Sequence, residues 1–387
     1  MSLPLPMSPG RSGFTPKLEL SYDSGPGNGI FGFGWKLETS EITRKTDKGL
    51  PQYCDSDESD VFILSGLEDL VPILDATGAR MMLPRTVYGT SYRISFYRPR
   101  IGGLFARIER WVAKDTGISH WRSLSRDNVT TLYRYDPTSR VADPTDPTKI
   151  FSRRISRSWD AKGNAAAYSY ADEYGAGINQ ALAAEADRTA ATRAVQTYLK
   201  TIQYGNLEPY FPGWTAATEA GLPSDWMFLA VLDYGDHGAS PPTPTSDQPW
   251  PVRPEPFSTC RAGFEIRTYR RVQRFLFFNN FPQEPTSGAN CLARSLDLVY
   301  SDQQAPADPR NPIYTFLVSA TETGYRHDSG TLVTRSMPAL EFAYSQPQIQ
   351  PGVLSLDRES LGNLPEGLDG TRFSQLDGAI STIIADH

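Results

Sequence analysis

One short pattern recurs along the chain: apolar and polar residues alternate, a tyrosine closes the run, and a turn signal follows. It is clearest at 18–22, before Asp23-Ser-Gly25, and at 228–234, before Gly235. The same pattern is found at 168–170, 202–204, 296–300 and 340–344. Because successive side chains of a strand point to opposite faces, this period of two predicts half-buried antiparallel strands.

Further strands are predicted at 61–64, 92–97, 104–112 and 129–135, and their short connections favour hairpins and meanders over helical crossovers. One segment differs. Residues 181–201 begin with an alanine-rich run and contain no Gly or Pro, which predicts a helix capped by Asn179. Proline-rich stretches at 143–147, 240–256 and 303–312 are predicted to be surface loops.

These patterns predict a mainly β fold, a large antiparallel meander or sandwich-like domain with one helix over about 180–201 and long proline-rich loops. The domain is predicted to span residues 1–346. A Gln- and Pro-rich stretch follows the last tyrosine-ended strand, and residues 347–387 then carry two Leu-Asp-Gly turn signals, at 368–370 and 376–378. This tail is predicted to be a linker and the start of a further unit.

Composition narrows the classes of function. The chain has 38 Lys and Arg against 44 Asp and Glu, a net charge of −6, which argues against a nucleic-acid-binding protein. The longest apolar run, Met227 to Leu232, is too short to cross a bilayer. The three cysteines are far apart, so neither a disulfide framework nor a CxxC metal clip is predicted. Residues 1–10 lack the features of a Sec signal peptide, so export would need another device.

Two motifs have part of the pattern of a binding site. Gly27-Asn-Gly-Ile-Phe-Gly32 satisfies GxGxxG, but a strand-like segment follows where a dinucleotide loop needs a helix. The cluster Asp55, Asp57 and Asp60 lacks the glycine and final glutamate of an EF-hand. The cluster is interpreted as a solvated turn, with a looser calcium site at these three aspartates as the alternative.

Other candidate chemistry is sparse. The four histidines, at 120, 237, 327 and 387, show no metal-binding spacing, and there is no GxSxG, no P-loop and no Glu-x-Glu pair. Five arginines interleave with aromatic residues at 261–275, a pattern that we interpret as cross-strand pairing or contact within a larger assembly. We therefore predict no catalytic residue, no cofactor-binding residue and no metal ligand.

A string of longer motifs is more specific. It comprises SPGRSGF at 8–14, LELSYDSGPGN at 18–28, FGFGW at 31–35 and ITRKTDKGLP at 42–51, and continues at 57–66, 226–235, 263–268 and 338–344. Together these resemble the N-terminal domain of the Salmonella virulence plasmid B protein, which also opens the B subunit of insecticidal toxin complexes (Tc toxins).

The resemblance implies a noncatalytic β-rich shell segment. In that family it combines with propeller repeats and RHS-type repeats to form a hollow cocoon around a toxic C-terminal payload, so any enzyme would lie in another domain or chain. Residues 347–387 would lead into the first propeller-type (FG-GAP or VCBS-like) repeat. The implied partners are an A-type translocation pore and a C-type payload or RHS protein, with no nucleic acid and no membrane span. The implied location is extracellular, after assembly in the producing cell's cytoplasm and export by a non-Sec route.

The alternative function is a surface-binding module that recognises a glycan or receptor. Trp111, Trp121, Trp214 and Trp250 would provide its aromatic platforms.

Overall fold

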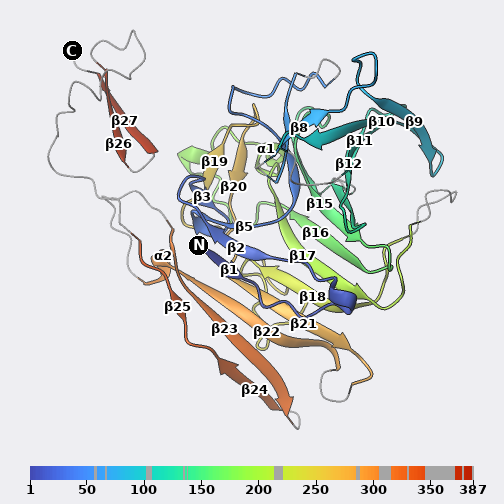
Figure 1. Cartoon of the computed structure of the whole chain (residues 1–387). Coiled ribbons are helices and arrows are strands. Elements are labelled where there is room, and N and C mark those ends of the chain that lie inside the picture. Colours follow the sequence, from blue (N-terminus) through green and yellow to red (C-terminus); the bar gives the residue numbers. More distant parts are fainter. Residues whose placement is uncertain are drawn as a thin grey trace.

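The fold was analysed in a computed structural model, drawn in Figure 1. It describes residues 1–55, 59–65, 68–101, 107–133, 136, 138–212, 221–284, 288–304, 315–328, 331–344, 371–376 and 379–385. Nearly all the regular structure in these residues is antiparallel strand, so the mainly β prediction is confirmed.

Eight of the described strands close into a ring. Each pairs with the next and the last pairs back to the first, so the circuit has no free edge. In order they are β6 (Glu41–Arg44), β7 (Phe62–Leu64), β8 (Glu68–Pro72), β10 (Thr90–Pro99), β11 (Arg107–Ala113), β12 (Ser119–Leu124), β13 (Thr130–Tyr133) and β15 (Ile150–Trp159). Two short strands attach at its margins, β9 (Met82–Val87) to β10 and β14 (Arg140–Ala142) to β15.

A long open sheet continues from β15. Its further strands are β16 (Ala165–Asp172), β17 (Thr197–Asn206), β18 (Trp226–Asp233), β21 (Arg274–Phe281), β22 (Gly288–Tyr300), β23 (Leu317–Asp328), β24 (Thr331–Ser336) and β25 (Leu340–Glu341). Most consecutive strands are neighbours, as a meander requires. Figure 1 shows the sheet running from the ring at the upper right to β24 at the bottom.

The N-terminal strands cross the middle of the molecule in front of this sheet (Figure 1). They are β1 (Ser2–Pro4), β2 (Glu19–Tyr22) and β5 (Trp35–Leu37), with the small hairpin of β3 (Asn28–Gly29) and β4 (Gly32–Phe33) between them. Leu20 and Trp35 join side chains from the ring, such as Phe62, and from the long sheet, such as Phe275, in one apolar core. The N-terminal segment therefore connects the ring to the sheet.

The recurring tyrosines have a specific role at the strand ends. Tyr204, Tyr234 and Tyr300 are all almost fully buried. Their hydroxyls donate to the backbone carbonyls of Ser8 (2.9 Å), Leu199 (2.9 Å) and Val272 (2.6 Å) respectively. Each ring thus fills the core while its hydroxyl ties a strand end to a neighbouring segment, the arrangement that suits a buried tyrosine.

The predicted long helix at 180–201 is wrong. The segment holds a 3-10 turn (Ala183–Glu185) and a four-residue helix, α1 (Ala190–Arg193), and from Thr197 it is already strand β17. Thr189 caps α1 with a capping box, whereas Asn179 only accepts the N–H of Ala181 in a local turn. Alanine-rich composition is a weak preference, and the buried ion pairs described below override it.

The remaining elements are small. β19 (Phe257–Thr259) pairs with β20 (Ile266–Thr268), α2 (Ser301–Gln304) follows β22, and a 3-10 turn covers Arg11–Gly13. No helix among the described residues is long and apolar enough to cross a membrane.

Near the C-terminus, β26 (Thr371–Leu376) and β27 (Ala379–Ala385) pair with each other. The predicted domain boundary at 346 lies outside the described residues, and the division of the chain there stays a prediction.

Candidate functional site

The interior of the strand ring opens at one end into a cup of about 1230 Å³. On β10 and β11, Tyr97 and Ile108 point into the core, and Arg93 and Arg110 lie on the same faces of these strands but line the cup. Tyr53, Asp55, Met82 and Arg140 also line it. We use "the cup" for this cavity, which is the kind of concave site where ligands bind at the open end of small closed sheets.

The floor of the cup is a buried ionic network. Arg44, 2% exposed, binds Asp55 and Asp60 through its Nη1 atom at 2.6 Å each, and its Nε donates to the carbonyl of Ile150 at 2.9 Å. Arg110 forms a second ion pair with Asp55. Burial raises the pKa of Asp55, but hydrogen bonds from Arg44 and the charge of Arg110 outweigh it and hold that pKa below its ordinary value.

This network replaces both sequence-based interpretations of the acidic cluster. Asp55 and Asp60 are neither a solvated turn nor free calcium ligands, because arginine guanidinium groups already contact their carboxylates. Asp60 also accepts the backbone N–H groups of Gln52 and Tyr53, at 2.8 and 2.9 Å. Asp57 lies outside the described residues.

The rim of the cup has a different character. Arg93 is exposed and forms no ion pair with the described residues. Arg140 forms one hydrogen bond within the described part of the chain, a long one of 3.4 Å to the carbonyl of Pro147. Burial lowers the pKa of Arg140. Leu74, Met82 and Ile118 add large apolar side chains that are 56%, 47% and 53% exposed. The rim thus combines cations that have no acidic partner with apolar surface.

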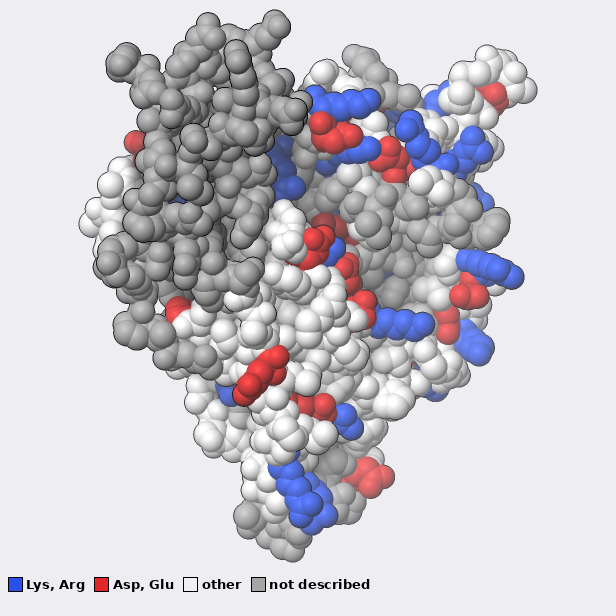
Figure 2. Space-filling view, turned by 60° about the vertical axis from the view of Figure 1, so that its left-hand side comes forward, with Lys and Arg blue, Asp and Glu red and all other residues white. Residues whose placement is uncertain are grey.

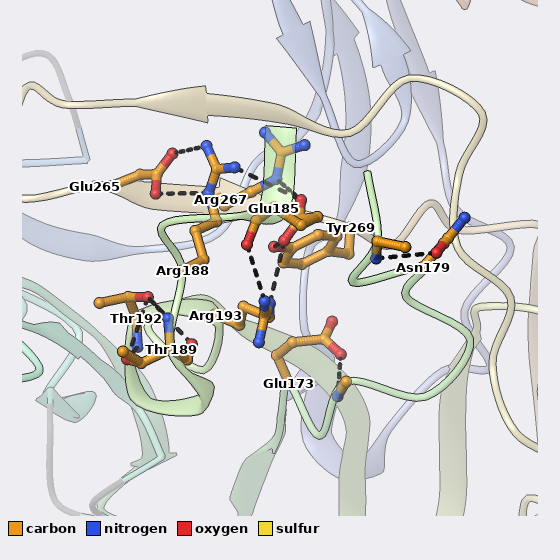
Figure 3. A network of polar contacts seen from close by, with 12 residues as sticks. Glu173, Asn179, Glu185, Arg188, Thr189, Thr192, Arg193, Glu265, Arg267 and Tyr269 are labelled. Atoms are coloured by element: carbon orange, nitrogen blue, oxygen red, sulfur yellow. Dashed lines mark hydrogen bonds and ion pairs between the residues drawn. The ribbon is translucent and has the colours of Figure 1, made fainter. Parts of the chain in front are cut away.

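A second polar network, shown in Figure 3, lies where the helix was predicted. The carboxylate of Glu185, a residue only 2% exposed, accepts Nε of Arg193 at 3.1 Å, Nε of Arg267 at 2.9 Å and the hydroxyl of Tyr269 at 2.8 Å. Beside it, Arg188 pairs with Glu265 at 2.6 Å. These contacts tie the 183–193 segment to β20 and leave it no freedom to form a long helix.

The contacts in this network fix the protonation states of Glu185 and Tyr269. Burial raises the pKa of Glu185, but hydrogen bonds from Tyr269 and Arg193 bring it below its ordinary value. Burial together with the neighbouring Glu185 raises the pKa of Tyr269 to about 12. The groups are held in one protonation state near neutral pH, as a structural clamp requires.

The arginine-rich segment 261–274 faces inward along most of its length. Each of the four arginines from 267 onward has a carboxylate partner: Arg267 with Glu185, Arg270 with Glu173, Arg271 with Asp302 and Arg274 with Asp233. All four ion pairs lie within the chain, and contact with a larger assembly stays a prediction. Of these pairs, only Arg274 with Asp233 is the predicted cross-strand pairing, between β21 and β18. The four arginines are therefore not available as a surface for phosphates.

The described residues also contain one cluster with the donor atoms of a metal site. Asp233, Asp236 and His237 are buried, with ligand atoms within 4.8 Å of one another. Arg274 binds Asp233 at 2.6 Å, and Lys200 lies 2.8 Å from Asp236 and 2.9 Å from His237 Nε2. These protein cations already neutralise the carboxylates, so the donor set does not fit a resident metal ion.

The remaining sequence candidates lie in the core or outside the described residues. Trp111, Trp121 and Trp250 are 1%, 0% and 3% exposed, so the aromatic glycan platform is wrong for these three. His120 stacks on Trp111. Trp214, His387 and the side chain of His327 are not among the described parts.

The glycine motif at 27–32 forms the β3–β4 hairpin, and strand β5 follows instead of a helix. Gly32 has φ +83°, and a Cβ there would lie 2.5 Å from the carbonyl oxygen of Thr315. The glycine therefore serves a close backbone approach and does not hold a nucleotide. Phe33 N–H makes the contact, donating to the same oxygen at 2.7 Å.

The cup is not predicted by any motif in the sequence. Its residues come from separate strands and loops, and no local spacing marks them. A charge count by segment would have pointed to it, because residues 80–126 hold ten Lys and Arg but only two acidic residues in a chain of net charge −6. Figure 2 shows Lys and Arg side chains gathering toward the upper right of the face it presents, with fewer Asp and Glu among them.

Comparison with known proteins places this architecture. The family model described as "Salmonella virulence plasmid 65kDa B protein" matches residues 1–281. The mono(ADP-ribosyl)transferase SpvB of Salmonella typhimurium strain 14028s is 34% identical over 340 residues, which are 85% of this chain and 54% of that protein. The SpvB of Salmonella dublin gives the same values. The chain thus spans about half the length of these curated relatives.

Solved structures agree. The N-terminal domain of the effector SpvB from Salmonella typhimurium strain LT2 matches with TM-score 0.73 and 34% identity, covering 84% of this chain and 98% of that one. The TcdB2-TccC3-Cdc42 complex matches with TM-score 0.75 and 29% identity, over 90% of this chain and 16% of that one. The Photorhabdus luminescens Tc holotoxin pore matches with TM-score 0.74 and 29% identity, over 89% of this chain and 15% of that one. The chain therefore belongs to the SpvB family of Salmonella virulence plasmid 65kDa B proteins.

Proposed function

We propose that this chain is a noncatalytic structural module of a secreted toxin, and that it forms part of a wall that encloses or delivers a toxic payload carried by another domain or chain. The observation that carries the proposal is the shared fold. Most of this chain matches both the SpvB N-terminal domain solved on its own and a part of the Tc complexes.

The physical character of the molecule supports the proposal. A wall needs extended sheet, protected strand edges and rigid connections, and it needs no activated nucleophile. Here the ring and the long sheet share one aromatic core. The buried carboxylates Glu173 and Glu185 and the partly buried Asp55 are held by arginines, and such pairing is typical of a structural network.

The wider setting follows from the same proposal. The partners would be other toxin-complex subunits, an A-type translocation pore and a C-type payload or RHS protein. Residues 347–387 would lead from the wall into a propeller-type repeat. Assembly would take place in the cytoplasm of the producing cell, before export by a non-Sec route.

An activity assay on the isolated chain tests the noncatalytic half of the proposal. The chain is incubated with labelled NAD⁺ and a eukaryotic cell lysate, and separately with hydrolase and protease substrates; a complete SpvB protein is the positive control for transfer. We expect no turnover above a heat-treated sample. Robust turnover that one point substitution abolishes would contradict the proposal.

Protease protection tests the enclosing half. The complete gene product, with any partner subunits, is treated with protease beside a variant that lacks residues 1–344. We expect a payload segment that resists cleavage in the intact protein and is cut rapidly in the variant. Equal cleavage of the payload in both proteins would show that this chain encloses nothing.

A further inference from the structure

The cup is a feature that a wall module does not need. Its floor is neutralised because Arg44 and Arg110 pair with Asp55 and Asp60, but its rim is not. Arg93 has no acidic partner among the described residues, and neither has Arg140.

Charge in the lining of the cup is predominantly positive. Four arginines line it, Arg80, Arg93, Arg110 and Arg140, against Asp55 and Asp136. The lining thus has two more positive than negative side chains, in a chain whose net charge is −6. A concave site of one sign with low-dielectric walls concentrates ligands of the opposite sign. The occupant is therefore anionic.

The apolar side chains at the rim restrict the kind of anion. Leu74, Met82 and Ile118 line the cup and are each about half exposed. Exposed apolar side chains grouped with polar ones are typical of a protein-binding surface. The two aspartates in the lining and the negative charge of the whole chain disfavour a phosphate backbone. A peptide that carries both carboxylates and apolar side chains fits these residues better.

The strand beside the cup offers a further contact. β9 pairs with β10 and with no other described strand, and Met82 to Thr86 are exposed along it. Met82 lines the cup, and period two places Pro84 and Thr86 on the same face. A free strand edge pairs readily with an extended peptide. Pro84 lacks an N–H group and limits how far such pairing runs.

We infer that the cup binds an extended acidic peptide with interleaved apolar residues, whose carboxylates contact Arg93 and Arg140 while an apolar side chain packs against Leu74, Met82 and Ile118. This inference does not depend on the proposed enclosing role. The cup is part of the fold of this chain whether or not the chain forms the wall around a payload.

The test starts from a phage-displayed library of random dodecapeptides selected on the purified chain. The most enriched sequence is then synthesised with a fluorescent label, and its binding is measured by fluorescence anisotropy. We expect enriched peptides to combine Asp or Glu with Leu, Ile, Val or Phe. Their affinity should fall as salt rises from about 0.05 to 0.5 M, because screening shortens the reach of the rim charges.

Matched charge reversals locate the site. The double variant Arg93→Glu/Arg140→Glu should weaken binding by about tenfold or more. Arg98→Glu is the control, because Arg98 is also an exposed arginine on β10 without a partner among the described residues but lies on the opposite face of the strand. It should change affinity less than about twofold. Circular dichroism confirms that each variant is folded.

Several outcomes would overturn the inference. They are no enrichment over a selection on the double variant, enrichment of basic peptides, or equal loss of affinity in Arg98→Glu. Binding of an oligothymidylate or of vesicles containing phosphatidylserine that is as tight as the peptide's and equally weakened in the double variant would assign the cup to a nucleic acid or to a membrane surface instead.

Discussion

The ion pair between Arg270 and Glu173 provides the sharpest test of how the fold is held. Both side chains are fully buried, and the guanidinium contacts both carboxylate oxygens. It also donates to the carbonyls of Trp250 at 2.8 Å and Ala176 at 2.9 Å, and its carbon lies 5.2 Å from the Trp250 ring centre. One arginine thus joins the loop after β16 to the 250–270 region.

Replacing Arg270 by methionine keeps the apolar stem and removes the charge. Glu173 is then left buried with the N–H of Gly175, 2.7 Å away, as its remaining hydrogen-bond donor given by the structure. Removing one partner of a buried pair costs about 3–5 kcal/mol, and we expect that loss in the free energy of unfolding. The double variant Arg270→Met/Glu173→Gln should cost clearly less than the two single variants together, since no uncompensated charge stays buried.

Urea unfolding followed by tryptophan fluorescence and by circular dichroism measures these values. The control is Arg294→Met. Arg294 pairs with Glu322 at 3.2 Å, but these side chains are 52% and 36% exposed, so the loss should stay below about 1 kcal/mol. The reasoning is refuted if Arg270→Met costs no more than the control, or if the two single costs simply add in the double variant.

Three further predictions concern backbone, hydroxyl and pH. Gly32→Ala should lower the free energy of unfolding by about 2–3 kcal/mol, because Gly32 has a positive φ and a backbone oxygen would lie 2.5 Å from the new Cβ. Gly221→Ala is the control and should be nearly neutral, because no atom lies within 4 Å of its Cβ position. Equal effects of the two substitutions in urea unfolding would contradict the close approach at Gly32. Tyr300→Phe should cost about 1 kcal/mol through the lost bond to Val272, and a neutral result would show that this hydroxyl does not stabilise the strand end. The pKa of Glu185 is lowered from 4.5 on folding, so its contribution to stability is complete above that pH and is lost as the pH falls through the folded value. The free energy of unfolding should therefore decrease less at acidic pH in Glu185→Gln than in the unchanged protein. An equal decrease in both proteins would contradict this role of Glu185.

Much of the fold could be predicted because it depends on local periodicity. The runs that end at Tyr204, Tyr234 and Tyr300 alternate over several residues, and each lies in or directly beside a strand of the long sheet. The short connections likewise indicated antiparallel neighbours. Closure of the eight strands into a ring was not predictable, because it depends on β15 pairing with β6, more than a hundred residues earlier.

The errors have a common physical cause. Helix preference at 181–201 contributes little free energy per residue. The contacts of Glu185 with Arg193, Arg267 and Tyr269 stabilise the observed conformation more strongly. Asp55 and Asp60 looked solvated because their partner Arg44 belongs to another strand. Arg267 and Tyr269 lie more than eighty residues after Glu185, and Arg44 lies 11 and 16 residues before Asp55 and Asp60, so no spacing within either segment reveals these contacts.

The position of this chain in its complete assembly tests the central claim most directly. Electron cryomicroscopy of the complete gene product with its partner subunits should show the ring and the long sheet built into the wall of a hollow particle that contains the payload. A map in which this chain extends outside such a particle, or in which a bound substrate occupies a catalytic cleft of this chain, would contradict the account.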